Sequence, residues 1–158
     1  MRKIQILLLL ILSQIAYSQV KNTDELYKTA KKLDSLIFDI GFNKCDLSHY
    51  DSIISEDLEF YHDIGGVTLG KKAFITSAKN NICGSPNKLR RELVANSMKV
   101  YPLYKDKTLY GLIQEGNHDF FFSENGTWKK GGRAKFTHLW VLENNQWKLK
   151  RVLSYDHQ

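Results

Sequence analysis

The segment from Arg133 to His157 constrains the fold of this chain more than any other part of the sequence. Polar and apolar residues alternate on both sides of Asn144-Asn145, a pattern typical of a long β-hairpin closed by a short turn. One face of its first strand carries Phe136, His138, Trp140 and Leu142, and the other carries Lys135, Thr137, Leu139 and Val141. Because both faces are half apolar, we expect both to be covered, one by helices and the other by a partner or a ligand.

The first eighteen residues have the organisation of a secretory signal peptide. Arg2 and Lys3 precede an apolar run from Ile4 to Ile15, and Ala16-Tyr17-Ser18 forms a small-x-small cleavage site. The run is shorter than the roughly 20 apolar residues that span a bilayer, and no cysteine follows the cleavage site to carry a lipid anchor. We predict a signal peptide over residues 1–18, rather than a buried N-terminal helix. The mature domain over residues 19–158 is then exported, to the periplasm or beyond, without a membrane anchor.

Composition and charge are those of one globular domain without a nucleic-acid surface. The chain has 158 residues, 42% of them hydrophobic, which is enough for a single domain with its own core. Removing Arg2 and Lys3 lowers the formal charge from +6 to +4, leaving 21 basic against 17 acidic residues. The basic residues are scattered rather than arranged in a stripe, so we expect no nucleic acid as a partner.

Cys45 and Cys83 are the only cysteines. In an oxidising compartment such a pair favours a disulfide, which would tie the helical N-terminal region to the loop at Gly84-Ser85-Pro86. The alternative is two buried free thiols, since free cysteine is among the most buried residue types. The spacing, without a nearby pair of histidines, argues against a zinc site.

The predicted elements are helical first and β afterwards. Amphipathic spacing indicates a helix over about residues 22–41, a shorter one from about residue 46, and a third over 71–81. Predicted strands span Leu58–His62, Val67–Leu69, Leu89–Tyr101, Thr108–Phe122, Arg133–Glu143 and Gln146–Tyr155. Helices segregated to one face of an antiparallel sheet make an α+β domain, and strands this long must curl. We therefore predict a curved antiparallel sheet wrapped around the N-terminal helices, a cone with one open end.

Two stretches carry a resemblance to a known family. Residues 58–75, LEFYHDIGGVTLGKKAFI, and residues 136–149, FTHLWVLENNQWKL, are similar to the strand-turn-helix and the closing hairpin of the nuclear transport factor 2-like superfamily, in its SnoaL-like and ketosteroid isomerase-like branch. The resemblance covers essentially the whole mature region and implies a cystatin-like cone. The superfamily holds isomerases, cyclases, hydrolases, dehydratases, binding subunits and uncharacterised exported bacterial members, so it specifies function weakly.

Polar residues that can carry chemistry lie near strand ends or on the hairpin. In a cone they would converge on one cavity and form a small-ligand site. The candidate ligand-binding residues are Tyr61, His118, His138, Arg151, Tyr155, Asp156 and His157, and the candidate catalytic residues are His62 and Asp63. Solvated histidines at strand ends are the alternative.

Asp63 is the most specific catalytic candidate. A carboxylate at the mouth of an apolar pocket can take a proton from a carbon next to a carbonyl. The resemblance implies that Asp63 matches the general base of the isomerase branch and that Tyr27 lies on the helix of its oxyanion tyrosine. His62 and the lack of a clear second acid depart from that pattern. Otherwise Asp63 is a turn residue before Gly65-Gly66.

His138 and Arg151 also have two interpretations. His138 is either a cavity ligand or a core histidine bonded to a neighbouring hydroxyl. Arg151 lies on an apolar face, so it pairs with an internal carboxylate (Asp63, Glu115 or Asp156) or with an acidic ligand. No metal site is predicted from His62, His118, His138 and His157, because they lack His-x-His or His-x3-His spacing.

Three functions remain open at this point. The first is an exported module that binds an unknown small molecule, without catalysis. The second is an enzyme of the isomerase, cyclase or hydrolase kind that uses Asp63 or His62 as base, and the third is an interaction domain whose cone is filled by Phe60, Phe120 and Trp140. The sequence has no phosphate loop, Gly-x-Ser-x-Gly elbow or Cys-x-x-Cys, so we expect no cofactor. Leu139, Trp140 and Trp147 suggest a homodimer formed through the sheet.

Overall fold

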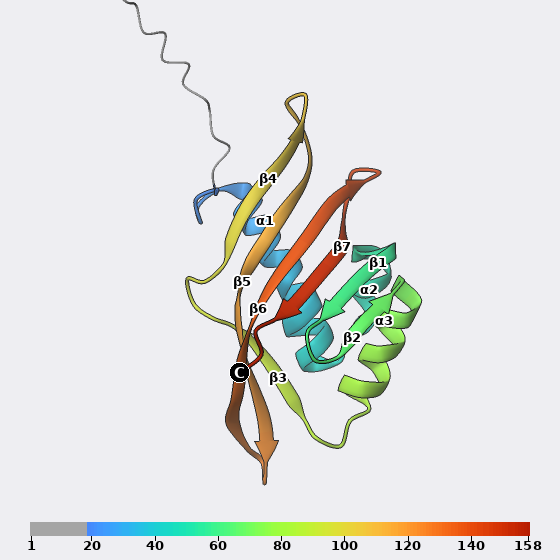
Figure 1. Ribbon diagram of the computed structural model, residues 1–158, viewed down its shortest axis with the longest axis vertical. Helices are drawn as coiled ribbons and strands as arrows, with labels where there is room; N and C mark the ends of the chain where they lie inside the picture. Colours follow the sequence, from blue (N-terminus) through green and yellow to red (C-terminus); the bar gives the residue numbers. More distant parts are fainter. Residues whose placement is uncertain (1–18) are drawn as a thin grey trace, which may run out of the picture.

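The computed structural model describes residues 19–158. The predicted signal peptide lies outside the described residues, so export stays a prediction. In the part of the chain that is described, no helix is both long and apolar enough to cross a membrane. The helices pack across one face of a single twisted sheet (Figure 1).

The first helix is regular over three turns and then widens. α1 spans Glu25–Ser35 and continues as the π-helix η1 over Leu36–Phe42, in agreement with the helix predicted over residues 22–41. Its inward side is apolar except for one acid, and the buried residues are Ala30, Leu33, Asp34, Ile37 and Gly41. Because they recur at helical spacing, this side faces the sheet.

The other helices are short. They are η2 (Leu47–His49), α2 (Tyr50–Ile53), α3 (Lys71–Ser77) and η3 (Ala78–Cys83). α3 and η3 together match the third predicted helix. The second predicted helix amounts to η2 and α2 only, because the chain already enters the sheet at Ile54.

Seven strands form the sheet. They are β1 (Ile54–His62), β2 (Gly66–Leu69), β3 (Leu89–Leu93), β4 (Lys99–Lys105), β5 (Thr108–Glu124), β6 (Thr127–Glu143) and β7 (Gln146–Tyr155). The order is β2-β1-β7-β6-β5-β3, with β4 also paired to β5. The predicted hairpin is present as β6 and β7, joined at Asn144-Asn145, both of which have positive φ.

The structure corrects two details of the predicted sheet. The strand predicted over Leu89–Tyr101 is two strands, β3 and β4, interrupted by a turn in which Asn96 has a φ of 60°. The sheet is also mixed rather than antiparallel, because β1 runs parallel to β7, with His62 opposite Ser154. Strands far apart in the sequence can pair in parallel, and side-chain alternation does not report strand direction. This parallel pair builds the site described below.

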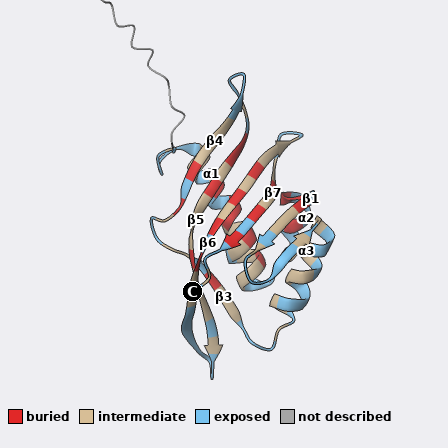
Figure 2. Ribbon diagram, viewed as in Figure 1, coloured by how far each residue is buried: buried red, intermediate tan, exposed pale blue. Residues whose placement is uncertain are grey.

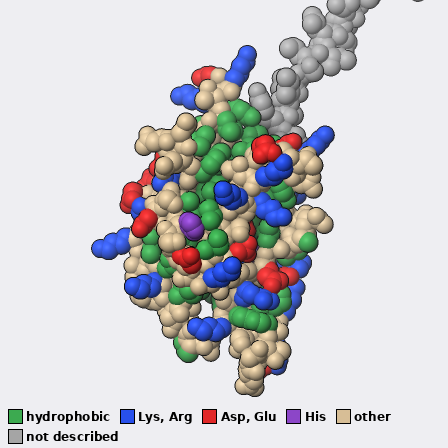
Figure 3. Space-filling view, turned by 180° about the vertical axis from the view of Figure 1, so that it is seen from behind, with side chains coloured by type: hydrophobic (Ala, Val, Ile, Leu, Met, Phe, Trp, Pro, Cys, Tyr) green, Lys and Arg blue, Asp and Glu red, His purple; other side chains and the backbone are tan. Residues whose placement is uncertain are grey.

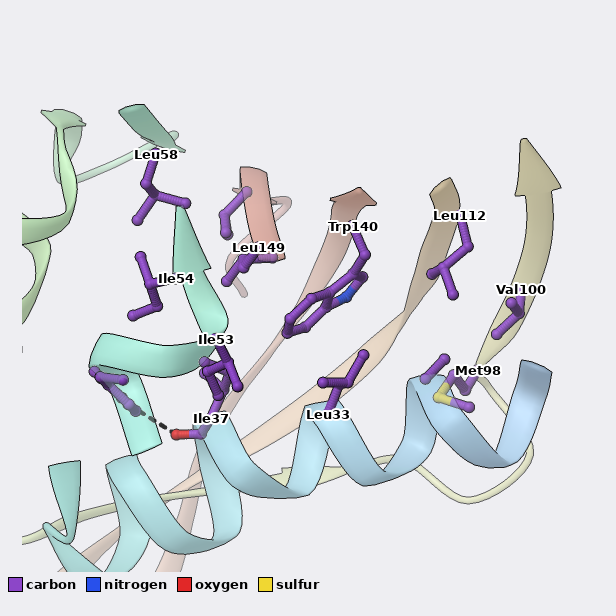
Figure 4. Close-up of a cluster of buried hydrophobic side chains, with 13 residues drawn as sticks. Leu33, Ile37, Ile53, Ile54, Leu58, Met98, Val100, Leu112, Trp140 and Leu149 are labelled. Atoms are coloured by element: carbon purple, nitrogen blue, oxygen red, sulfur yellow. Dashed lines mark hydrogen bonds between the residues drawn. The ribbon is translucent and has the colours of Figure 1, made fainter. Parts of the chain in front are cut away.

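The core lies between α1 with η1 and the inner face of the sheet (Figure 4). Leu33 and Ile37 point from the helix toward Trp140, Leu112 and Leu149 on three different strands. Trp140 is fully buried, so it cannot contribute to an outer dimer face as its position in the hairpin suggested. Burial is concentrated in the middle of the sheet, and the far end of the β5–β6 hairpin is exposed (Figure 2).

The two cysteines form a disulfide across 38 residues of sequence, with their Cα atoms 5.5 Å apart. The bond joins Cys45, directly after the helical segment that follows α1, to Cys83 at the end of η3. It therefore ties together two helical segments that cover the same end of the sheet.

The outer face of the sheet is partly apolar and open. Leu153, Tyr61 and Val67 are neighbours across β7, β1 and β2, and each is more than 40% exposed. The predicted homodimer through the sheet stays a prediction.

The side of the molecule that faces away from the reader in Figure 1 has no single-sign patch of charge among the described residues. On this side, Lys and Arg side chains are scattered among acidic and apolar ones (Figure 3).

Candidate functional site

A cavity of about 560 Å³ lies between the helices and the inner face of the sheet. Its lining is mostly aromatic and aliphatic, with residues from η1, α2, α3, η3 and six strands. Phenylalanines dominate the wall: Phe38, Phe42, Phe60, Phe74, Phe120 and Phe136. Four histidines interrupt it: His62, His118, His138 and His157. The predicted convergence of histidines on one cavity is what the structure shows.

A buried ion pair, Arg91 with Asp34, lies behind the residues that line the cavity. Arg91 and Asp34 are 1% and 3% exposed, and the guanidinium donates to both carboxylate oxygens at 2.7 and 3.1 Å. Arg91 also lies over the ring of Phe38, with 3.7 Å from Cζ to the ring centroid. A buried charge pair needs such complete bonding, because removing either partner strands the other in an apolar interior.

Gln114 connects this pair to His138. Its amide nitrogen donates to Asp34 at 3.3 Å, and its amide oxygen accepts from the Trp140 indole at 2.9 Å and lies 3.3 Å from Nδ1 of His138. An amide oxygen only accepts, so Nδ1 of His138 carries the proton. Complete burial lowers the pKa of His138 well below its ordinary value, and this histidine is neutral at pH 7.

His118 lines the cavity and carries a donor without a partner in the described part of the chain. Nε of Arg91 donates to its Nδ1 at 3.2 Å, so the neutral ring carries its proton on Nε2. Among the described residues, this Nε2 has no hydrogen-bond partner although His118 is only 3% exposed. Burial, and then the charge of Arg91, lower the pKa of His118 to about 3. The ring is therefore a neutral hydrogen-bond donor that lacks an acceptor.

At the opposite end of the cavity, His157 is bonded to Asp63. Nδ1 of His157 lies 2.6 Å from one carboxylate oxygen, and its main-chain N–H donates to the other at 3.2 Å. Desolvation alone would raise the pKa of Asp63, but these two hydrogen bonds outweigh it and lower the pKa. Since an ionised carboxylate only accepts, the proton is on Nδ1, and in the neutral ring Nε2 keeps its lone pair.

His62 stacks on His157 with the opposite tautomer. The ring centroids are 4.2 Å apart, and Nδ1 of His62 accepts from the main-chain N–H groups of Ile64 and Gly65 at 3.1 and 3.0 Å. In the neutral ring the proton is therefore on Nε2. Burial, and then the proximity of His157, lower the pKa of His62.

His62, Asp63 and His157 offer ligand atoms that all lie within 4.8 Å of one another. Two histidines and a carboxylate are suitable metal ligands by type. However, Nδ1 of His62 is occupied by two N–H donors, and Nδ1 of His157 is bonded to the carboxylate itself. In both rings Nδ1 therefore already has a hydrogen-bond partner.

Four predicted ligand-binding residues do not face the cavity. Tyr61 and Arg151 bond to Glu59 at 2.6 and 2.8 Å, and Asp156 pairs with Lys135 at 3.0 Å, all outside the cavity lining. Tyr155 is 38% exposed. The expectation that these four line the cavity is wrong, because Tyr61, Arg151 and Tyr155 lie in register with outward-facing neighbours. Arg151 has a carboxylate partner within the protein, but that partner is Glu59 rather than Asp63, Glu115 or Asp156.

None of the three residues of the buried network was predicted from the sequence: Asp34, Arg91 and Gln114. Asp34 continues the apolar stripe of α1 at i+4 from Ala30, and Arg91 occupies the inward position between Leu89 and Leu93. A charge at such positions requires a buried partner, and this was the available signal. Gln114 had no comparable signal. Tyr27, considered for an oxyanion role, packs against the core and does not line the cavity.

Comparison with solved structures decides the fold. An NTF2-like protein of unknown function from Pseudomonas putida KT2440 superposes with a TM-score of 0.65 over 80% of this chain and 83% of its own, at 11% identity. A protein of unknown function with a cystatin-like fold from Nostoc punctiforme gives 0.62 over 83% and 91%, at 13% identity. The chain has a nuclear transport factor 2-like fold.

A third protein with this NTF2-like fold, from Catenulispora acidiphila, was solved in complex with S-DNPA. It has a TM-score of 0.62 over 82% of this chain and 92% of its own, at 10% identity. Comparison of the sequence with family models and with curated proteins finds no match. The NTF2-like fold is compatible with a small-molecule-binding domain, and the SnoaL-like branch stays a prediction.

Proposed function

We propose that this chain binds a small, mostly apolar molecule that carries a hydrogen-bond acceptor such as a ketone oxygen. The observation that carries this proposal is Nε2 of His118, a buried donor without a partner among residues 19–158, on a residue that lines a mostly apolar cavity. Leaving such a group unpaired costs roughly 1 to 3 kcal/mol, which a ligand acceptor would recover. Because burial, and then the charge of Arg91, lower the pKa of His118 and keep its ring neutral, an uncharged acceptor suffices.

The size of the cavity supports this proposal. A volume of about 560 Å³ lies within the roughly 300–1,000 Å³ range of small-molecule sites. Phe60 and Phe120 line the cavity without filling it, and Trp140 lies in the core. The filled-cone interaction domain therefore has less support. The neighbour solved with S-DNPA is a precedent for a small molecule on this fold. The predicted signal peptide would place the ligand outside the cytoplasm.

The test compares ligands that differ only in the acceptor. A bicyclic ketone and its methylene analogue are titrated into the protein, by calorimetry for the ketone and by competition for the analogue. The ketone should bind about tenfold tighter or more, and His118→Phe should remove that preference while apolar binding persists. His49→Phe is the control, because His49 is exposed and outside the cavity. Equal affinities, or a preference that survives in His118→Phe, would contradict the proposal.

A second candidate function is proton transfer to or from the bound molecule. It is favoured by one observation, the 2.6 Å bond between Asp63 and His157, which leaves Nε2 of His157 as a base on the cavity wall. In this arrangement Asp63 orients the base rather than acting as one, and His62, with Nδ1 occupied, supplies a donor. Deuterium exchange at the carbon next to the ketone, followed by NMR, tests this function. Deuterium exchange should be lost in His157→Gln. If the wild-type protein exchanges the ketone no faster than buffer does, the proton-transfer function is excluded.

A further inference from the structure

Ser154 lies beside His157 in the cavity. It is on the inner face of β7, is 7% exposed, and lines the cavity together with His62 and His157. The parallel register puts it directly opposite His62, and its carbonyl oxygen accepts from the main-chain N–H of Asp63 at 3.1 Å. The main chain therefore fixes both Ser154 and Asp63 relative to the turn between β1 and β2.

The three side chains form a continuous hydrogen-bonded series. The hydroxyl oxygen of Ser154 lies 3.4 Å from Nε2 of His157, and Nδ1 of the same ring lies 2.6 Å from Asp63. Since Nδ1 carries the proton, Nε2 is the acceptor and the hydroxyl is the donor. A serine bonded to a histidine that a carboxylate orients is the arrangement of an activated nucleophile, which is recognised by geometry rather than by sequence order.

We propose that Ser154 is a nucleophile and that the cavity hydrolyses small apolar esters. The proposal rests on the binding of carbonyl compounds in the cavity proposed above. The Ser154 oxygen forms a bond to the ester carbonyl carbon while His157 takes the hydroxyl proton, and His157 then gives that proton to the departing alcohol. Water attacks the resulting acyl-serine with His157 again as base, and the carboxylic acid and free Ser154 are released.

Donors for the developing oxyanion are available on the same cavity wall. His118 and His62 both carry their protons on Nε2 in the neutral ring, and both line the cavity with Ser154. Fixed neutral donors that face a water-poor site stabilise an oxyanion more than they stabilise the ground-state carbonyl. Asp63 holds the required tautomer of His157 through two hydrogen bonds.

An alkyl fluorophosphonate tests the nucleophile directly, because it reacts with activated serines and leaves a stable adduct. The whole mature chain is incubated with the probe, measured by intact mass and digested to map the adduct. We expect one adduct, on Ser154, that is lost in Ser154→Ala and in His157→Gln but kept in Ser52→Ala. Ser52 is a matched control because its hydroxyl is exposed and donates to the carbonyl of His49. No adduct, or an adduct at another residue, overturns the proposal.

Hydrolysis of p-nitrophenyl butyrate supplies the second readout. Turnover should fall to the buffer rate in Ser154→Ala and by about 10² to 10⁴-fold in Asp63→Asn, which leaves His157 without its orienting carboxylate. The ketone titration is repeated on each variant to show that the cavity is intact. Ketone binding without adduct or turnover would overturn the nucleophile and leave the binding function standing. If the wild-type protein does not bind the ketone and gives neither adduct nor turnover, the binding function and the nucleophile are both wrong.

Discussion

The main-chain N–H of Asp63 donates to the carbonyl oxygen of Ser154 at 3.1 Å. This bond extends the parallel pairing of β1 with β7 by one residue beyond His62. It brings the turn after β1 against the end of β7, so that His157, three residues further along, reaches the carboxylate of Asp63. The polar end of the cavity is therefore a product of strand order, since Asp63 and His157 are 94 residues apart in the sequence.

The tautomers of the cavity histidines are the first prediction. In its neutral form the His157 ring should carry its proton on Nδ1, because this atom is bonded to a carboxylate. The neutral rings of His62 and His118 should carry theirs on Nε2, because their Nδ1 atoms accept from N–H groups. Long-range proton–nitrogen NMR spectra of the imidazole rings distinguish the two forms. In Asp63→Asn the His157 ring should lose its fixed tautomer while His118 keeps its own. A wild-type His157 protonated on Nε2 would contradict the assigned base.

Acid should destabilise the protein before its carboxylates titrate. Folding lowers the pKa of His118 to about 3 and that of His138 well below its ordinary value, so the unfolded chain binds protons that the native chain does not. The free energy of unfolding should thus be unaffected by these groups above about pH 6.5 and fall as the pH drops toward 5. The slope should be roughly 1 to 2 kcal/mol per pH unit for each histidine.

Urea unfolding at pH 7, 6 and 5 measures this slope. His118→Gln should reduce this slope by the contribution of about one bound proton. His49→Gln, at an exposed position, is the control variant. A free energy of unfolding that stays constant from pH 7 to pH 5 would mean that His118 and His138 are not buried as neutral rings.

Arg91→Met should be among the most destabilising single changes. It would leave the buried Asp34 carboxyl without its cationic partner, at a cost of about 3 to 5 kcal/mol, and would release His118 from its fixed tautomer. The double variant Arg91→Met with Asp34→Leu should recover much of that loss, because no buried charge then remains. Arg133→Met is the matched control: Arg133 is 43% exposed in its pair with Asp119, so losing this pair should matter far less than losing the fully buried one. Equal urea midpoints for Arg91→Met and Arg133→Met would contradict the buried pair.

The disulfide should stabilise the helical end of the cavity. Closing a loop of 38 residues contributes roughly 3 to 4 kcal/mol in the chain-entropy model, so reductant should lower the melting temperature. The Cys45→Ser, Cys83→Ser double variant should melt at that lower temperature with or without reductant. If reductant leaves the wild-type melting temperature unchanged and the intact mass shows two free thiols, the bond is not formed in solution.

The fold was predictable from the sequence because its signals are local. Alternation on both sides of Asn144-Asn145 identified the hairpin, and helical spacing identified α1, since both depend on neighbours in the chain. Strand pairing between distant segments has no such signal, so the parallel β1–β7 pair was predicted wrongly as part of an antiparallel sheet.

The site was predictable only in part for the same reason. The histidines at strand ends reach the cavity, but Tyr61 and Tyr155 point outward because the register, which the sequence does not report, decides the face. Which histidine is the base depends on partners that only the folded chain supplies. Asp63 was predicted as a base, and its bonds to His157, which the sequence does not report, are the reason for the orienting role proposed above.

The binding proposal is tested most directly at the Nε2 proton of His118. The bicyclic ketone is titrated into isotopically labelled protein while the imidazole signals are followed by NMR. A bound ketone oxygen should shift the Nε2 proton of His118 downfield in proportion to saturation and slow its exchange with water, without moving the His49 signals. If the ketone saturates the protein and the His118 signal stays where it was, the buried donor does not hold the ligand and the proposed function is wrong.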